Sequence, residues 1–503
     1  MVTYSKFEHK YSKSSFKYRE PISGDYRVFV NGSEIPVYTC RISKFPFNRA
    51  WPGHQREINQ TELASFVNIV SDEEINVEVI VNGEYEKIIL KPYSKGIAYE
   101  DEDGSVKFKL KENGQFVLGK DNLHNCLYIF NNKPVVCLEP ASVTHYFGPG
   151  VHMPGKLQLK DNESVYIDKD ALVFGCIYAE DAENIRIFGN GILDDSAEER
   201  YSVHCYEKFT NGNMKFYDCK NIKVEGVLLR NSAIWCVNLF HCLDVELDNI
   251  KIFGQWRYNT DGVDIVNSRN ILLKNSFIHS FDDSVTIKGI DRYIDTNNEN
   301  IVTENCVLWC DWGKACEIGF ETACRKYKNI IFKNCDILRS AGYALDIANG
   351  DCAEVSDVVF ENINVEYNSF DDMMVIQNDD EHQYSYDGIW KRILISVKND
   401  RFRNDSYCDG VWGIPKELAE VDLSGIKQAT VHDVIVKNIT VYYDEEIQSE
   451  DDKYSLLIEI DSCLENVEHY NITLENIVVN GKKLNEENAT IKISCVNNFE
   501  FID

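Results

Sequence analysis

Residues 244–252 read DVELDNIKI, and the pattern returns as NILLKNSFI at 270–278, NIVTENCVL at 300–308 and NIIFKNCDI at 329–337. Each copy opens with Asn or Asp and then alternates apolar with other residues, and Asn recurs near its middle. This two-residue period and the many β-branched side chains predict strands. Further copies begin at residues 184, 221, 357, 433 and 471. Repeats of this kind cannot bury their apolar faces alone, so they predict stacked coils, which is a parallel β-helix.

The Asn in the middle of each copy is unusual, because Asn has a low β propensity. Stacked coils explain it, since strands about 4.8 Å apart bring the same position of each coil within hydrogen-bonding distance. Polar turn residues without mutual contact are the alternative. We predict a side-chain ladder along Asn249, Asn275, Asn305, Asn334 and Asn362.

The chain is predicted to contain two domains. Residues 20–130 lack the repeat and show short alternating runs with Asn-Gly pairs at 31–32, 82–83 and 113–114, which are hairpin signals. We therefore predict an all-β protein, with a small antiparallel β-sandwich over residues 1–135 and the parallel β-helix over 136–503. The 76-residue interval before the copy at Asp433 is too long for one coil and predicts an insertion over about 368–428, with a lid as one interpretation.

Composition excludes several classes of function. The chain has 52 Lys+Arg against 82 Asp+Glu, a net charge of −30, which disfavours nonspecific binding to nucleic acid or to an anionic membrane. No segment has the roughly 18 to 20 apolar residues of a membrane span, and the polar first residues lack a signal-peptide pattern. The 17 cysteines include no CxxC pair, so we expect reduced core thiols in a cytoplasmic protein, without a metal or cofactor.

Two acidic motifs are the candidate catalytic centre: RYNTDGVDIV at 257–266 and SFDDSVTIKG at 280–289. Asp261 and Asp282 lie 21 residues apart, close to one coil. Aligning the coils on Ile265, Ile287, Ile318 and Ile347 predicts two columns. One holds Asp264, Thr286, Glu317 and Asp346, and the other holds Asp261, Asp283, Lys314 and Tyr343.

Carboxyls brought together in this way raise one another's pKa, so that one stays protonated beside an ionised neighbour. Glycosidic cleavage needs such a pair, one group to protonate the leaving oxygen and one to activate water. Turn-capping aspartates and a calcium site are the alternatives, although no stretch has the spacing of a calcium-binding loop.

NTDGVDIV followed by DDSVTIK resembles the polygalacturonase family, family 28 of the glycoside hydrolases. The resemblance covers roughly residues 145–479, including HYFGPGVH and NIRIFGNGILD. It implies a right-handed β-helix of the pectin-lyase type and hydrolysis with inversion. It also implies that Asp282 is the general acid and that Asp261 and Asp283 position and deprotonate water. Inversion rests on the resemblance alone, because stacked coils suggest closer carboxyls than the usual spacing of about 6.5 to 9.5 Å. The two-domain architecture is similar to that of family 49 dextranases.

The chain departs from the family where cations would hold a substrate carboxylate. Lys314 in GKACEIGFE replaces the His of Gly-His-Gly, and Asp346 and Ala348 replace the cations of Arg-Ile-Lys. Losing two cations removes the bonds to a uronate, and Asp346 would repel one, so we predict a neutral sugar. The polar substrate-binding candidates are Asp264, Lys288, Lys314, Glu317, Glu321 and Asp346. For Lys288, a structural ion pair is the alternative to hydroxyl binding.

Tryptophans are the candidates for stacking on sugar rings, with core packing as the alternative for each. They are Trp235, Trp256, Trp309 and Trp312 in the β-helix, together with Trp51, which lies with His54 in the loop at 47–56. That loop would reach the sugar site or form an ordinary interdomain contact.

The sequence thus predicts a cytoplasmic glycoside hydrolase, exo-acting on imported neutral oligosaccharides and without a cofactor. Three alternatives remain open. The substrate could be pectic oligogalacturonide. The chemistry could be that of a lyase, epimerase or transglycosidase, with Lys314 as a candidate base, because parallel β-helices host several reactions. The chain could also be a carbohydrate-binding protein without activity. The sequence leaves open whether the chain forms a homo-oligomer.

Overall fold

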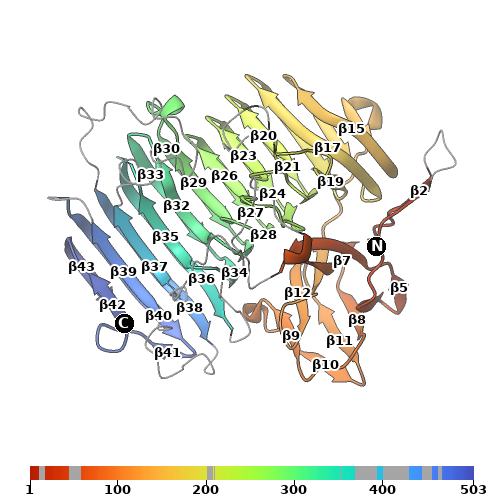
Figure 1. The fold of residues 1–503 in the computed structure, drawn as a ribbon, viewed down its shortest axis with the longest axis horizontal. Helices are drawn as coiled ribbons and strands as arrows, with labels where there is room; N and C mark the ends of the chain where they lie inside the picture. The colour runs from red at the N-terminus through yellow and green to blue at the C-terminus, as the bar shows by residue number, and fades with distance from the viewer. Residues whose placement is uncertain are drawn as a thin grey trace, which may run out of the picture.

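The computed structural model describes residues 1–10, 17–44, 58–200, 208, 210–351, 353–368, 393–399, 430–443, 456–462 and 467–502. It has two parts, a small β-sandwich near the N-terminus and a long stack of parallel strands that runs to the C-terminus (Figure 1). In the described part of the chain, no helix is long and apolar enough to span a membrane.

Two sheets form the sandwich. The first contains β1 (Val2–Tyr4), β6 (Tyr38–Ser43), β7 (Thr61–Ser71), β9 (Ile88–Lys91), β12 (Gly114–Lys120) and β13 (Leu127–Asn132). The second contains β4 (Tyr26–Val30), β5 (Ser33–Ile35), β8 (Ile75–Val81), β10 (Tyr99–Glu102) and β11 (Ser105–Leu110). The pairs are antiparallel, as predicted, except that β13 runs parallel to β7. A small hairpin joins β2 (Glu8–Lys10) to β3 (Lys17–Arg19).

Three parallel ladders of strands build the β-helix. The first, which carries the acidic motifs, contains β15 (Gly150–Leu159), β17 (Ala171–Glu180), β20 (Met214–Tyr217), β23 (Val237–Phe240), β26 (Val263–Val266), β29 (Val285–Gly289), β32 (Lys314–Thr322), β35 (Tyr343–Asn349), β37 (Ile393–Asn399), β39 (Leu457–Ser462) and β42 (Thr490–Ile493). The second contains β14 (His145–Phe147), β16 (Ser164–Ile167), β18 (Glu183–Gly189), β21 (Lys220–Glu225), β24 (Leu243–Asp248), β27 (Arg269–Lys274), β30 (Asn298–Glu304), β33 (Lys326–Lys333), β36 (Glu354–Tyr367), β38 (Val431–Tyr443), β40 (His469–Val479) and β43 (Val496–Ile502). The third contains β19 (Ile192–Asp194), β22 (Leu228–Arg230), β25 (Lys251–Ile252), β28 (Phe277–Ser280), β31 (Val307–Cys310) and β34 (Asp336–Arg339), and ends on β36.

The predicted fold class, a right-handed parallel β-helix preceded by a β-sandwich, is confirmed. The predicted coil alignment is also correct, since Ile265 pairs with Ile287, Ile287 with Ile318, and Ile318 with Ile347. Alternation sends one face of each strand inward, so these isoleucines stack in one continuous apolar core.

The predicted asparagine ladder exists, with two differences. Asn305 donates to Asn275, Asn362 donates to Asn334, and the ladder continues through Asn438 and Asn476. However, Asn275 donates to Asp248 and not to Asn249, and in the described structure no side-chain hydrogen bond joins Asn334 to Asn305. The five predicted asparagines have φ between 53° and 56°. Asn adopts this left-handed conformation more readily than other residues that carry a side chain, which explains its presence at a corner of the coil.

The predicted insertion over about 368–428 is wrong in one respect. Within it, residues 393–399 form β37, which pairs with β35 on one side and β39 on the other. Because β36 also pairs directly with β38, the 76-residue interval is a single coil with long connections. The other residues of the predicted insertion, and the lid interpretation, lie outside the described residues except for Asn368.

The sandwich packs on the third ladder through the outer face of its first sheet. Phe66 lies 5.0 Å from Phe253, and Phe130 lies 5.3 Å from Phe277, measured between ring centres. A buried ion pair adds to this contact. Lys91 of β9 pairs with Glu366 of β36, and its Nζ also donates to Asn368 at 3.0 Å.

Replacing Lys91 with Met is expected to lower the free energy of unfolding by about 3–5 kcal/mol, because the buried carboxylate of Glu366 loses its counterion. Urea unfolding followed by circular dichroism measures this. Lys95→Met is the matched control, since Lys95 is exposed and its pairing with Asp336 contributes little. Equal stability of the two variants would contradict a structural role for the buried pair.

Candidate active site

The two acidic motifs lie side by side on adjacent coils of the first ladder. Asp261 lies two residues before β26, and Asp282 and Asp283 lie in the turn between β28 and β29. The backbone fixes their distance, because the Gly262 nitrogen donates to the Asp283 carbonyl at 2.8 Å. The predicted column that begins with Asp264 is also present, because Asp264 pairs with Thr286, Thr286 with Glu317, and Glu317 with Asp346. The structure therefore brings together all the predicted acids except Glu321, which joins them through a lysine.

That lysine is Lys288 on β29, which is buried among four carboxylates. Its Nζ lies 3.5 Å from Asp261, 3.8 Å from Asp264, 3.7 Å from Asp283 and 3.4 Å from Glu321. A cation surrounded in this way lowers the cost of burying several negative charges together. The geometry favours the structural ion-pair interpretation of Lys288 over direct hydroxyl binding.

Lys314, which replaces the histidine of the resembled family, contacts the acids from the next coil. Its Nζ donates to Glu317 at 2.5 Å, and its backbone nitrogen donates to Asp283 at 2.9 Å. Lys314 thus links the turn of Asp282 and Asp283 to the column of Glu317 and Asp346. Its ion pair leaves it a poor general base, because neighbouring carboxylates raise the pKa of its ammonium group against the effect of burial.

The environment separates the protonation states of the two adjacent aspartates. Burial and the charge of Asp283 raise the pKa of Asp282 to about 7. Burial also acts on Asp283, but the charges of Lys314 and Lys288 outweigh it and lower the pKa of that carboxyl. A carboxylic acid that holds its proton near neutral pH therefore stands beside an ionised carboxylate, which is the pairing that acid–base catalysis requires.

The other acids of the site hold their protons more tightly than usual. Burial and the charge of Asp264 raise the pKa of Asp261, and burial with the charge of Asp283 raises the pKa of Glu317. Burial raises the pKa of Asp346 to about 6. A carboxyl group in its protonated form donates as well as accepts hydrogen bonds, which suits recognition of sugar hydroxyls.

Gly313 is a functional position that the sequence did not reveal. A Cβ on this residue would lie 2.6 Å from Oδ1 of Asp282 and 2.2 Å from Oδ1 of Asp283. The space that a side chain would occupy is therefore filled by the two carboxylates. The residue stands in the quoted stretch GKACEIGFE, but the carboxylates beside it come from the previous coil, so no local signal marks it.

The prediction of sugar stacking is wrong for two of the tryptophans. Trp309 is fully buried, 4.1 Å from the His279 ring, and its Nε1 donates to Asp311 at 2.9 Å where the sandwich meets the β-helix. Trp235 is also buried, and the Nζ of Lys288 lies 4.5 Å above its ring. This contact stabilises the lysine through a cation–π interaction and occupies the ring face that a sugar would need.

The remaining aromatic candidates stay predictions. Trp312 is partly exposed next to the catalytic turn and stacks parallel to Phe281. Trp256 is partly exposed, and its Nε1 donates to Asn231 at 3.2 Å. Trp51 and His54 lie outside the described residues.

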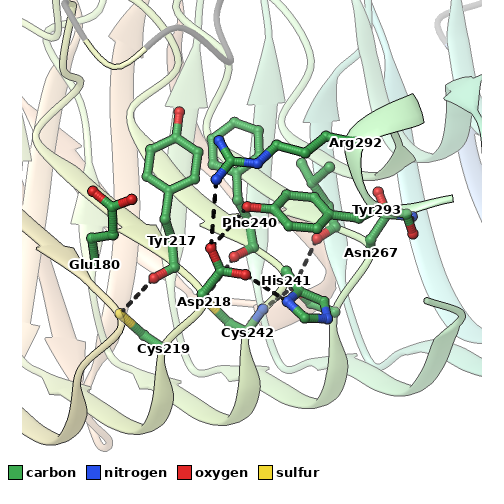
Figure 2. A network of polar contacts seen from close by, with 12 residues as sticks. Glu180, Tyr217, Asp218, Cys219, Phe240, His241, Cys242, Asn267, Arg292 and Tyr293 are labelled. Atoms are coloured by element: carbon green, nitrogen blue, oxygen red, sulfur yellow. Dashed lines mark hydrogen bonds and ion pairs between the residues drawn. The ribbon is translucent and has the colours of Figure 1, made fainter. Parts of the chain in front are cut away.

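A polar network that reaches from Asp218 to Tyr293 holds the turn that follows Lys288 (Figure 2). Asp218 lies 2.7 Å from Nδ1 of His241 and accepts from the Tyr293 hydroxyl at 3.0 Å, while Arg292 approaches it at 3.8 Å. Asn267 donates to the Tyr293 carbonyl and accepts from the Ile290 nitrogen. These contacts fix the 3-10 turn η5 (Asp291–Tyr293). The backbone nitrogen of Asn267 also donates to the Lys288 carbonyl at 3.0 Å. The sequence did not reveal this network, because its members are spread over some 75 residues.

One further group of side chains has ligand atoms close together. Sγ of Cys176 and the carboxylates of Asp195 and Glu198 lie within 4.8 Å of one another. Burial raises the pKa of Asp195 well above its usual value.

Comparison with known proteins identifies one family and several relatives. The family described as "Glycosyl hydrolases family 28" matches residues 147–446. Probable rhamnogalacturonase A of Aspergillus oryzae is 28% identical over 149 residues, which is 30% of this chain and 30% of that protein. An exopolygalacturonase of Cochliobolus carbonum is 28% identical over 144 residues, which is 27% of this chain and 30% of that protein. The chain thus spans under a third of the length of these curated relatives.

Among solved structures, Dex49A from Penicillium minioluteum superposes with a TM-score of 0.64 at 12% identity, covering 96% of this chain and 95% of that one. At this identity the likeness concerns the fold. The predicted similarity in architecture to family 49 is confirmed at that level.

Proposed function

Since this chain belongs to glycosyl hydrolases family 28, we propose that it hydrolyses a glycosidic bond in a neutral oligosaccharide. In this proposal Asp282 protonates the leaving oxygen, Asp261 and Asp283 position the water, and Asp283, whose pKa is lowered, takes its proton. The charges of Lys288 and Lys314 lower the pKa of Asp283 and so keep it ionised, whereas the pKa of Asp282 is raised to about 7. Inversion, exo action on imported oligosaccharides and a cytoplasmic location are further parts of the proposal.

The neutral substrate is supported by the charge of the face that continues from the acids. Glu317 and Asp346 are paired in register on β32 and β35, and both are buried. Among the residues that the structure describes, the cations on this face are engaged, since Lys288 and Lys314 pair with carboxylates of the site and Lys398 of β37 pairs with Glu459. A uronate carboxylate would meet fixed acids and cations already in use, whereas a hydroxyl finds both donors and acceptors.

A substrate panel tests this. We expect the unmutated enzyme to show at least a tenfold higher kcat/KM on neutral gluco- or galacto-oligosaccharides than on oligogalacturonides of equal length, because a uronate has to be desolvated beside Asp346. Reducing-end assays give the rates, and the Asp282→Asn variant corrects for contaminating activity. Faster cleavage of oligogalacturonides would overturn the neutral-substrate proposal while leaving hydrolysis intact.

A pectic substrate is the second candidate, and the names of the relatives favour it, since they include rhamnogalacturonase and exopolygalacturonase. The same panel decides between the two. A product with a new ultraviolet-absorbing double bond would instead indicate a lyase. Products labelled at the reducing end with 18O-water show which side of the bond receives water, and their release one unit at a time would support exo action.

A further inference from the structure

A groove with a volume of about 1070 Å³ lies between the sandwich and the β-helix, and none of the catalytic acids lines it. Its sandwich wall consists of residues 94–98 and 109–116, and its β-helix wall includes the asparagine ladder from Asn249 to Asn362. Figure 1 shows the sandwich beside the middle coils of the β-helix. We call this space the interdomain groove. Its volume is slightly above the range of about 300–1,000 Å³ that is typical of ligand sites.

Direct contacts between the two domains bound the groove near both ends of the ladder. Gln115 donates to the Asn249 side chain at 3.2 Å and to the Asn275 carbonyl at 2.9 Å. Toward the other end, the Ser94 hydroxyl donates to Asp336 at 2.5 Å and Lys95 lies 3.4 Å from the same carboxylate. The groove lies between these contacts.

The ladder is interrupted at the step between those contacts. Asn305 uses its amide nitrogen on Asn275, and Asn334 uses its carbonyl oxygen on Asn362. Among the described residues, no hydrogen bond joins the Asn305 oxygen to the Asn334 nitrogen, and both side chains are exposed and line the groove. An acceptor and a donor without a mutual hydrogen bond therefore stand on neighbouring coils. A hydroxyl group, which both donates and accepts, is able to bridge such a pair.

The residues that line the interdomain groove indicate which class of ligand it would bind. The groove is lined by four lysines and four carboxylates, so it is formally neutral in a chain that carries a net charge of −30. A polyanion or a polycation has no preference for such a surface. Ile97 is partly exposed and adds apolar surface to the wall, whereas Phe116 and Val307 are buried. Amides in series and balanced charge suit the hydroxyls of a neutral glycan.

We propose that the interdomain groove is a second, non-catalytic binding site for a neutral glycan chain that runs along the asparagine ladder. The choice of glycan rests on the proposed function, and the site itself rests on the geometry of the groove. Holding a long chain there would raise the local concentration of its free end near the acids without adding a catalytic group.

Binding to the full-length Asp282→Asn protein tests this, because the protein then does not consume its ligand. The probes are neutral heptasaccharides of the gluco and galacto series, with heptagalacturonate as the charged comparison, measured by isothermal titration calorimetry. We expect two sites for a neutral probe. Adding Asn305→Ala and Asn334→Ala is expected to weaken one of them at least tenfold. Ala98→Trp, which fills the groove without touching the ladder, is expected to do the same.

The matched control is Asn438→Ala with Asn476→Ala, which removes two amides of the same ladder outside the groove. Binding of the neutral probe that the groove variants leave unchanged would overturn the inference, as would no binding at all or equal loss in the control pair. Failure of the proposed function looks different: the unmutated enzyme would then not hydrolyse neutral oligosaccharides, whether or not the groove binds them. In the active enzyme, the groove variants should raise KM for long chains only, with kcat and the rates on trisaccharides unchanged.

Discussion

Asp282→Asn is expected to lower kcat about 1,000-fold, within the range of about 10²–10⁴ that a positioned acid or base contributes. The amide fills the same space as the carboxylic acid but does not protonate the leaving oxygen. We expect the fold to survive, because Asp282 is partly exposed and the backbone bonds of its turn remain. Steady-state kinetics on the best neutral substrate measure the loss, and circular dichroism checks the fold.

The pH dependence gives this prediction a second readout. Because the pKa of Asp282 is raised to about 7, its protonated form is available below that pH and is lost as the pH rises through it. The pKa of Asp283 is lowered, so the ionised base persists far into the acidic range. The unmutated enzyme should therefore lose activity above about pH 7, and this limb should disappear in Asp282→Asn. Asp295→Asn, an exposed carboxylate on a nearby turn, is the control. Activity of Asp282→Asn within threefold of the unmutated enzyme would remove Asp282 from the mechanism.

Gly313→Ala is expected to lower kcat about 100-fold through geometry alone. Its Cβ would lie 2.2 Å from Asp283 Oδ1 and 2.6 Å from Asp282 Oδ1, closer than atoms in contact allow. The two carboxylates have to move, and a displacement of about 1 Å at a reacting group costs about that factor. Added bulk in a packed site also lowers stability, by about 1–3 kcal/mol.

Gly24→Ala is the matched control for this variant, because no heavy atom lies within 4 Å of the Cβ it would add. Kinetics below the unfolding temperature separate misplaced carboxylates from global unfolding. A Gly313→Ala enzyme with full kcat would show that the two aspartates do not need their present positions, and would count against both as reacting groups.

The arrangement of the first ladder was predictable because a strand has a strict period. Once one isoleucine of each coil is aligned, every other residue of the strand follows at a known offset. The pairing of Asp264 with Thr286, of Glu317 with Asp346, and of the four isoleucines agrees with that alignment. The strand β37 was not predictable in the same way, because the repeat pattern marks strands of the second ladder and β37 belongs to the first. Long connections also separate β37 from the repeats on either side of it.

The tryptophans were less predictable, because a side chain's exposure depends on what covers it. Trp309 alternates outward on β31, where a sugar could reach it, but the sandwich covers that face. Its neighbour His279 is bonded to Tyr128, a residue 151 positions away in the chain. Trp235 lies near the acids, as expected, yet its face is taken by a lysine from another coil.

Short-range pattern was enough for the parallel β-helix, the register of its coils and the grouping of Asp261, Asp282 and Asp283, because period and coil length act along the chain and need no distant partner. Contacts between coils and between domains decided the rest. They set which aspartate keeps its proton, since that depends on where Lys288 and Lys314 place their charges. They also leave no room for a side chain at residue 313, and they leave a groove between the sandwich and the β-helix. Electrostatic and steric effects act through space, so groups far apart in the chain control them.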